Sequence, residues 1–292
     1  MRRSDRLEES ARCLDLLLEK NVPAEHIKSD PIEIPHRYDD PREIEIAALI
    51  SALLAYGRID LFKKVIERML DLAEGRLFQY IHDFSPERER PRFKGIYYRF
   101  NTEEDLFSLI HLLSRVVRAR GSIGAYFLST YREDNEDTGP ALTRFTALLK
   151  TLLPRPVSPG LRYLFPSPKT GSACKRLNLF LRWMVRPNDG VDFGLWTRIP
   201  ARKLIIPLDT HVIRIAKYLK MTTRKTPDWK MAREITAFLK RCAPEDPLKY
   251  DFALCHLGVS GGCPLEANPK KCGVCPLLAI CSRGNHVVHG SA

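Results

Sequence analysis

Four cysteines near the C-terminus have the spacing of metal ligands. Cys263, Cys272, Cys275 and Cys281 are separated by eight, two and five residues. A CxxC turn flanked by short loops can bring several thiolates to one metal centre, whereas a disulfide framework is disfavoured in the cytosol. Zinc ribbons usually pair two CxxC turns, and this segment has one. We therefore predict a [4Fe–4S] cluster, with zinc as the alternative.

A single acidic residue stands where an apolar segment turns into a helix. In "KLIIPLDTHVIRIAKYL", Asp209 directly precedes the helical pattern. An N-cap carboxylate accepts backbone N–H bonds, and its charge suits the positive end of the helix. The same carboxylate could balance positive charge that develops in a reaction. Asp209 is therefore a candidate for both roles.

The remaining cysteines are expected to be buried thiols. Cys255 lies eight residues before the first predicted ligand, within a helical pattern, and is favoured as a buried thiol over a fifth ligand. Cys13, Cys174 and Cys242 are scattered, and we expect each to act as a small apolar side chain.

The chain is strongly basic. Its net charge of +12 and its pI near 9.4 favour a polyanionic partner, because clustered Lys and Arg displace counterions from phosphates. The longest mainly apolar run, 44–57, is too short to span a membrane, and the N-terminus lacks a secretory signal. We expect a cytoplasmic monomer with no membrane partner.

These residues must be positioned by helices, because helical signals dominate and no segment shows sustained period-two alternation. We predict an all-α protein. The expected helices cover residues 4–21, 39–57, 101–121, 174–186, 210–219, 227–241 and 247–258. The Pro-rich segments 83–95 and 152–172 are expected to be long connections.

The second of these helices has an apolar interior and should be the buried centre of a bundle. Asp40 is its expected N-cap, with Glu43 completing a capping box and Gly57 ending the helix. Thr102 and Asp105 suggest a second capping box further along the chain.

The order of these features resembles the helix-hairpin-helix DNA glycosylase superfamily, in the iron–sulfur branch typified by endonuclease III and adenine glycosylase. "LDTHVIR" is similar to the segment that carries the catalytic aspartate in that branch, and "EIAALISALLAYGR" is similar to its central helix. The last two cysteine intervals agree with the branch, while the first is two residues longer. Within the superfamily, "KRLNLFLRWMVR", "LIIPLDTHV" and "KYDFAL" are similar to signatures of the DUF2400 family.

The resemblance implies a two-lobed, DNA glycosylase-like fold with a C-terminal cluster loop. Residues 40–204 would form a helical barrel with a hairpin-like segment. Residues 1–39 and 205–292 would together form the domain that contains the cluster. The function implied is a DNA repair glycosylase, a hydrolase that also has AP lyase activity if it uses a lysine nucleophile. Its partner would be damaged DNA in the nucleoid, with an oxidised base as the first substrate candidate.

The resemblance also assigns roles to individual residues. Asp209 would be catalytic, and Lys175 would be the nucleophile, with Lys169 as the second candidate. The residues implied in DNA binding are His211, Arg176, Lys169 and Arg214. Four aromatic residues could line a pocket for an extruded base, although core packing is favoured for Trp183: Tyr56, Trp183, Phe193 and Trp196.

Two departures from the superfamily favour a different function. The glycine-rich hairpin is replaced by "LFPSPKTGSACKRLNLFL", with Gly171 as its only glycine, and the glutamine of the central helix is an apolar residue near Leu53. The alternative is therefore a non-catalytic iron–sulfur protein that binds nucleic acid and keeps the same fold.

Overall fold

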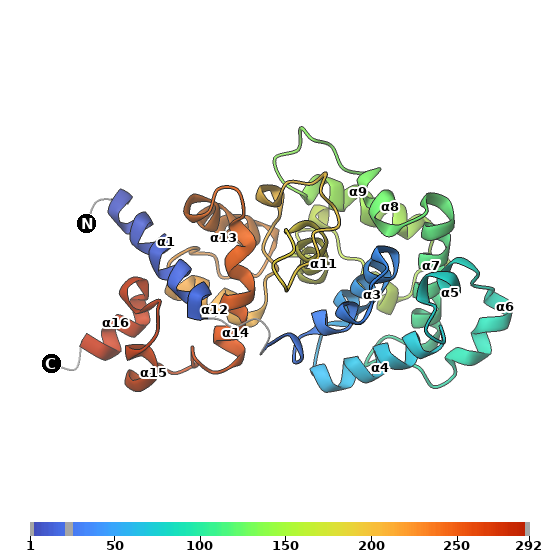
Figure 1. Cartoon of the computed structure of the whole chain (residues 1–292), viewed down its shortest axis with the longest axis horizontal. Coiled ribbons are helices and arrows are strands. Elements are labelled where there is room, and N and C mark those ends of the chain that lie inside the picture. The colour runs from blue at the N-terminus through green and yellow to red at the C-terminus, as the bar shows by residue number, and fades with distance from the viewer. Residues whose placement is uncertain (1–2, 21–25, 290–292) are drawn as a thin grey trace.

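The computed structural model describes residues 3–20 and 26–289 and is built from helices (Figure 1). Over these residues the only β-type pairings are two isolated bridges, Tyr98 with Asn101 and Ser172 with Asp228. The all-α prediction is confirmed. Residue 21, the expected end of the first helix, and parts of 1–39 and 205–292 lie outside the described residues. No helix in the described ranges combines the length and apolar character that a membrane span requires.

One group of helices comes from the middle of the chain and lies on one side of the molecule in Figure 1. Its members are α3 (Pro41–Leu54), α4 (Ile59–Asp71), α5 (Leu77–His82), α6 (Pro86–Glu89), α7 (Glu103–Arg120), α8 (Ile123–Leu128), α9 (Gly139–Thr151), α10 (Pro159–Leu164) and α11 (Lys175–Val185). Five 3₁₀ turns precede, interrupt or follow them: η1 (Pro31–Glu33), η2 (Pro35–Arg37), η3 (Arg90–Phe93), η4 (Pro168–Thr170) and η5 (Ala201–Lys203).

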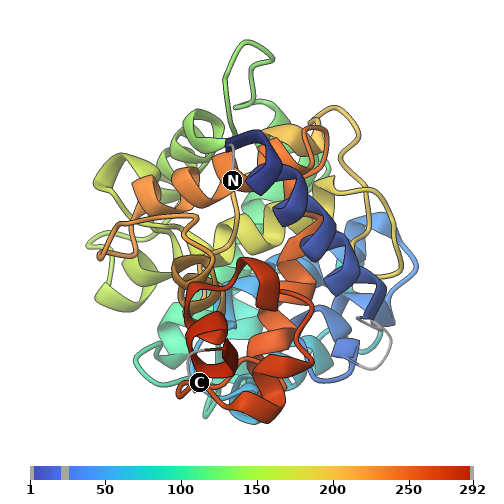
Figure 2. The same cartoon turned by 90° about the vertical axis from the view of Figure 1, so that its left-hand side faces the viewer.

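The opposite side of the molecule combines the two ends of the chain. It contains α1 (Arg3–Lys20), α12 (Thr210–Tyr218), α13 (Trp229–Cys242), η6 (Pro247–Tyr250), α14 (Asp251–Val259), α15 (Pro269–Gly273), η7 (Leu278–Ile280) and α16 (Ser282–His289). Helix α1 packs against α13, α14 and η7, and Figure 2 shows it running across the C-terminal helices.

Helix α3 is the buried centre of the first group, as its composition predicts. Every residue from Ile44 to Leu54 is buried, and the helix packs against α4, α5 and α11. Its one buried carboxylate, Glu45, accepts hydrogen bonds from the Trp196 indole at 2.7 Å and from the Gly124 backbone at 2.9 Å. Burial raises the pKa of Glu45.

The ends of α3 differ from the prediction. Asp40 is the N-cap, but Glu43 accepts a hydrogen bond from the Phe78 backbone at 2.9 Å instead of completing a capping box. The helix ends at Leu54, and Gly57, with φ of +80°, lies in the following turn. The Thr102 and Asp105 capping box on α7 is confirmed.

Several short helices were not expected. The Pro-rich segments are not plain connections, because they contain α6, η3, α10 and η4. Proline occupies the first position of α6 and α10. It is tolerated there because the backbone N–H at the first position of a helix has no hydrogen-bond partner within the helix. Helices α4, α5, α8, α9, α15 and α16 were also not predicted.

A buried ion-pair network joins the two groups of helices. The Arg182 guanidinium on α11 donates to Asp192 at 3.1 Å and to Asp251 on α14 at 2.5 Å. All three side chains are at most 4% exposed. A parallel link runs from Arg186 to Asp246 at 2.9 Å.

Replacing Arg182 should destabilise the protein strongly, because the change leaves the buried Asp251 carboxylate without its cation and leaves Asp192 with Arg186 alone. For Arg182→Leu we expect the free energy of unfolding to fall by about 3–5 kcal/mol, measured by urea denaturation. The control is Arg233→Leu, which removes an exposed guanidinium from ion pairs with Glu136 and Asp137 and should cost less than about 1 kcal/mol. Equal losses in the two variants would contradict a special role for the buried pair.

Candidate functional site

A cleft of about 340 Å³ lies between the two groups of helices. One wall comes from the end of α3, the start of α4 and one face of α11, and the other comes from α12 and α14. Residues around the start of η1 complete the lining. On α11 the residues that face the cleft are Lys175, Leu179 and Arg182, which recur at helical spacing on one stripe. On α14 the facing residues include Asp251, Cys255 and Val259, spaced by one turn each.

Asp209 is held at the N-terminus of α12 with both carboxylate oxygens bonded. Its Oδ1 accepts the Val212 backbone N–H at 2.7 Å, which confirms the predicted N-cap. Its Oδ2 accepts a hydrogen bond from the Cys255 thiol on α14 at 2.8 Å. Asp209 is half-buried and lines the cleft.

Lys175 is the first residue of α11 and lines the same cleft. The preceding residue, Cys174, has a left-handed backbone with φ of +48° and gives the helix no side-chain cap. Lys175 is half-buried, and within the described part of the chain its amine makes no hydrogen bond or ion pair. A cation at a helix N-terminus opposes the helix dipole, so this position is not explained by helix stability.

The floor of the cleft carries further ionisable groups. Burial raises the pKa of Asp251 to about 6, an effect that Arg182 opposes and Asp209 reinforces. Burial, with the Asp209 charge beside it, also raises the pKa of the Cys255 thiol well above its usual value. The thiol therefore stays protonated at neutral pH and can donate. Asp30, at the cleft edge, contacts His256 at 3.3 Å.

His211 and Arg214 connect the cleft to the cysteine segment. The His211 side chain lines the cleft, and its Nδ1 accepts from Arg214 at 3.3 Å. Arg214 also donates to the Cys263 carbonyl at 2.6 Å, while its Nε is buried without a partner among the described residues. In the structure Arg214 is thus directed toward the cysteines, and the expectation that it contacts DNA is not supported by this geometry.

The structure corrects the role expected for Arg176. Its side chain is only 7% exposed. The guanidinium donates to the carbonyl of Leu53 at 2.6 Å and to that of Tyr163, and lies 4.1 Å from the Tyr163 ring centroid. With its donors occupied inside the protein, Arg176 fastens α11 to α3 and does not reach a DNA phosphate.

The other predicted residues lie outside the cleft lining. Lys169 is exposed on η4, so a surface role in DNA binding stays open to it. Trp183 and Trp196 are buried core residues, as favoured for Trp183. Tyr56 and Phe193 are half-buried and pack against the core.

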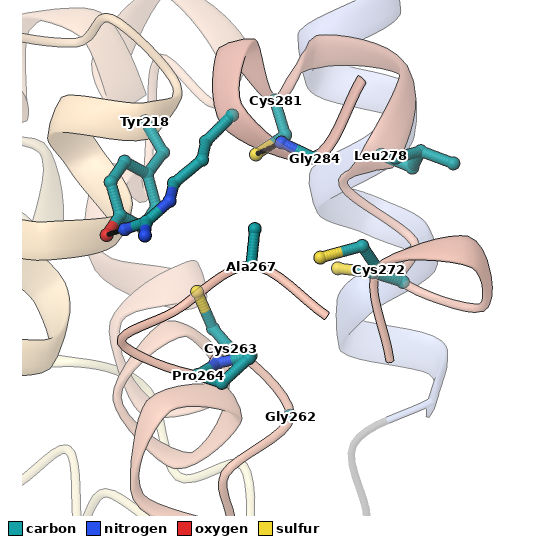
Figure 3. A pocket seen from close by; sticks show the side chains of 11 residues that line it. Tyr218, Gly262, Cys263, Pro264, Ala267, Cys272, Leu278, Cys281 and Gly284 are labelled. Atoms are coloured by element: carbon teal, nitrogen blue, oxygen red, sulfur yellow. Dashed lines mark hydrogen bonds between the residues drawn. The ribbon is translucent and has the colours of Figure 1, made fainter. Parts of the chain in front are cut away.

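The four predicted ligands Cys263, Cys272, Cys275 and Cys281 line one small apolar pocket of about 40 Å³. In Figure 3 the side chains of Cys263, Cys272 and Cys281 point into the space between the loops. The backbone N–H of Gly284 donates to the Cys281 sulfur at 3.2 Å. Cys255 lies in the cleft and not in this pocket, which agrees with the preference for a thiol other than a ligand. Cys13 and Cys174 are buried as expected. Cys242 is only half-buried.

Sequence reasoning missed the surroundings of Asp209. It expected Cys255 to be a buried thiol, and the structure finds the residue half-buried. It gave no sign that the thiol contacts the carboxylate, and it did not select Arg182 or Asp251. One available signal was charge within apolar helices: Arg182 in "FLRWMV" and Asp251 in "KYDFAL" each interrupt an apolar stretch. Charged residues in such places are usually paired.

The comparisons with known proteins identify a family but no activity. A family model described as "Protein of unknown function (DUF2400)" matches residues 30–260. No curated protein and no solved structure matches the chain.

The close packing of α14 on α12 depends on Gly258. A Cβ at this position would lie 2.5 Å from the Cβ of His211. For Gly258→Ala we expect a loss of about 1–3 kcal/mol in the free energy of unfolding, because the two helices must separate. Gly273→Ala is the matched control, since a Cβ there meets nothing within 4 Å. Thermal unfolding that is unchanged in both variants would contradict this tight contact.

Proposed function

The chain belongs to the DUF2400 family, whose function is unknown, and from the cleft we propose that it is a DNA repair glycosylase with AP lyase activity. The observation that carries the proposal is that Lys175 and Asp209 line one cleft from opposite walls. Their groups are not joined by an ion pair. The amine is therefore not committed to the carboxylate, and a substrate could lie between them.

The proposed reaction assigns one step to each residue. The Lys175 amine, in its neutral form, attacks C1′ of the damaged nucleoside, and the bond from C1′ to the base breaks. The base leaves with the bonding electrons and takes up a proton. The Asp209 carboxylate stabilises the positive charge that develops on the sugar. The amine adduct then opens to a Schiff base, from which elimination of the 3′ phosphate cleaves the strand.

The backbone at Cys174 supports a functional role for Lys175. A left-handed conformation in a residue other than glycine costs about 1–3 kcal/mol and concentrates at functional sites. Here it directly precedes the proposed nucleophile at the start of α11.

Charge supports DNA as the partner. The net charge is +12. The exposed lysines of the region around α12 and α13 have no ion-pair partner among the described residues: Lys217, Lys220, Lys225 and Lys230. We propose that the protein works as a monomer on nucleoid DNA in the cytoplasm, with an oxidised base as its first substrate candidate. The two groups of helices would then be the lobes of a glycosylase-like fold, divided near residues 40 and 204.

The cysteine pocket fits an iron–sulfur cluster in its donor set and surroundings. The four cysteines would hold the cluster, and the unpartnered Nε of Arg214 lies beside Cys263, where an anionic cluster would offset its charge. Among the described residues, no three His, Cys, Asp or Glu groups are arranged to bind one metal ion. The single CxxC turn is the observation that favours the cluster over zinc. When bound, the cluster would fasten the C-terminal loops together.

The activity test uses purified protein with duplex and single-stranded oligonucleotides that carry a panel of base lesions. We expect excision of at least one lesion and strand cleavage by the wild type. Asp209→Asn should lower the single-turnover rate by about 100-fold or more, and Lys175→Gln should abolish strand cleavage. Lys94→Gln, which changes an exposed lysine outside the cleft, is the control and should keep the activity.

Salt-dependent binding of DNA with no excision of any lesion would contradict the glycosylase proposal. That result would support the non-catalytic nucleic-acid-binding alternative.

The cluster prediction is independent of catalysis. Cys272→Ser should lose bound iron and sulfide and lower the thermal stability, because assembly of the site and folding of its loops are coupled. Cys242→Ser, at a half-buried cysteine outside the pocket, should keep both. Iron and sulfide are measured by elemental and colorimetric analysis. Zinc in place of iron, or full iron retention in Cys272→Ser, would count against the [4Fe–4S] assignment.

A further inference from the structure

We propose that Cys255 is a positioning residue, whose thiol fixes the orientation of the Asp209 carboxylate for the reaction. The inference rests on the proposed function, because it concerns the same carboxylate. It assigns a role to a residue that touches neither the sugar nor the base.

Hydrogen bonds to both oxygens restrict the rotation of the Asp209 carboxylate. One oxygen is bonded to the Val212 backbone at 2.7 Å and the other to the Cys255 sulfur at 2.8 Å. The bond from the Val212 backbone to Oδ1 is an ordinary helix cap. With that bond alone, the carboxylate could still rotate and change the position of Oδ2. The thiol removes that freedom because it comes from a different helix, α14.

Helix α14 is itself held firmly against α12. Four residues before Cys255, Asp251 is anchored by the buried Arg182, and three residues after it, Gly258 allows contact with His211. The thiol is thus carried by a helix that is fixed on both sides of it. A donor on a rigid helix places the carboxylate more accurately than a donor on a loop would.

A thiol suits this position better than a stronger donor. S–H is a weak hydrogen-bond donor, so it holds the carboxylate while leaving most of its negative charge to act on the sugar.

The experiment measures activity and the thiol itself. The kcat and KM of excision are compared for the wild type, Cys255→Ala and Cys255→Ser on the lesion that the wild type excises. We expect Cys255→Ala to lower kcat by about 10-fold or more with little change in KM, the loss typical of removing a positioning partner. Cys255→Ser, whose hydroxyl can also donate, should recover most of kcat. Cys242→Ala, a half-buried thiol outside the cleft, is the matched control and should match the wild type.

The infrared S–H band gives a readout that does not depend on turnover. The difference spectrum between the wild type and Cys255→Ser isolates the Cys255 band. In the Asp209→Asn variant this band should move toward the frequency of a free thiol, because the amide is a weaker acceptor than the carboxylate.

The possible failures are distinct. If the wild type excises nothing, the proposed function fails and the positioning role fails with it. If the wild type is active but Cys255→Ala is equally active, or if the S–H band does not respond to Asp209→Asn, only the positioning role is overturned.

Discussion

The buried guanidinium of Arg182 is the constraint on which the cleft depends. It lies on α11 and bonds to Asp251 on α14, so it sets how closely the two walls approach. Two helical turns separate Arg182 from Lys175, about 10 Å along the axis of α11, and one turn separates Asp251 from Cys255. The ion pair at the floor therefore fixes the proposed nucleophile on one wall relative to the proposed carboxylate on the other.

The same pair shapes the electrostatics of the cleft. Asp251 is buried enough for its pKa to rise to about 6 despite its contact with Arg182. The nearby Asp209 is half-buried and reaches the cleft surface. The two carboxylates thus have different roles, because Asp251 holds the walls together while Asp209 is open to a ligand. Lys175, without a partner among the described residues, adds an uncommitted amine to the same space.

The sequence predicted those parts of the structure that depend on local patterns. Asp209 as an N-cap, the buried helix α3 and the capping box of α7 follow from residue types at fixed offsets. Contacts between distant segments could not be predicted in this way. Glu43 has the spacing of a capping box, yet it bonds to the Phe78 backbone, because tertiary packing offered it another donor.

Arg176 shows the same limit for function. The sequence places a basic residue next to the proposed nucleophile, but the fold turns it inward to the carbonyl of Leu53. Conversely, the bond between Cys255 and Asp209 joins residues 46 positions apart, and no local pattern indicates it. What the sequence could identify was the pair Asp209 and Lys175, and what the structure adds is that both line one cleft.

The central claim is that Lys175 attacks the sugar of a damaged nucleotide within this cleft. The most direct measurement is peptide mapping by mass spectrometry after borohydride reduction of the protein with its lesion-containing oligonucleotide. We predict one reduced sugar adduct, on the Lys175 side chain. An adduct on Lys169 or on another amine, or excision that leaves no adduct, would contradict this claim.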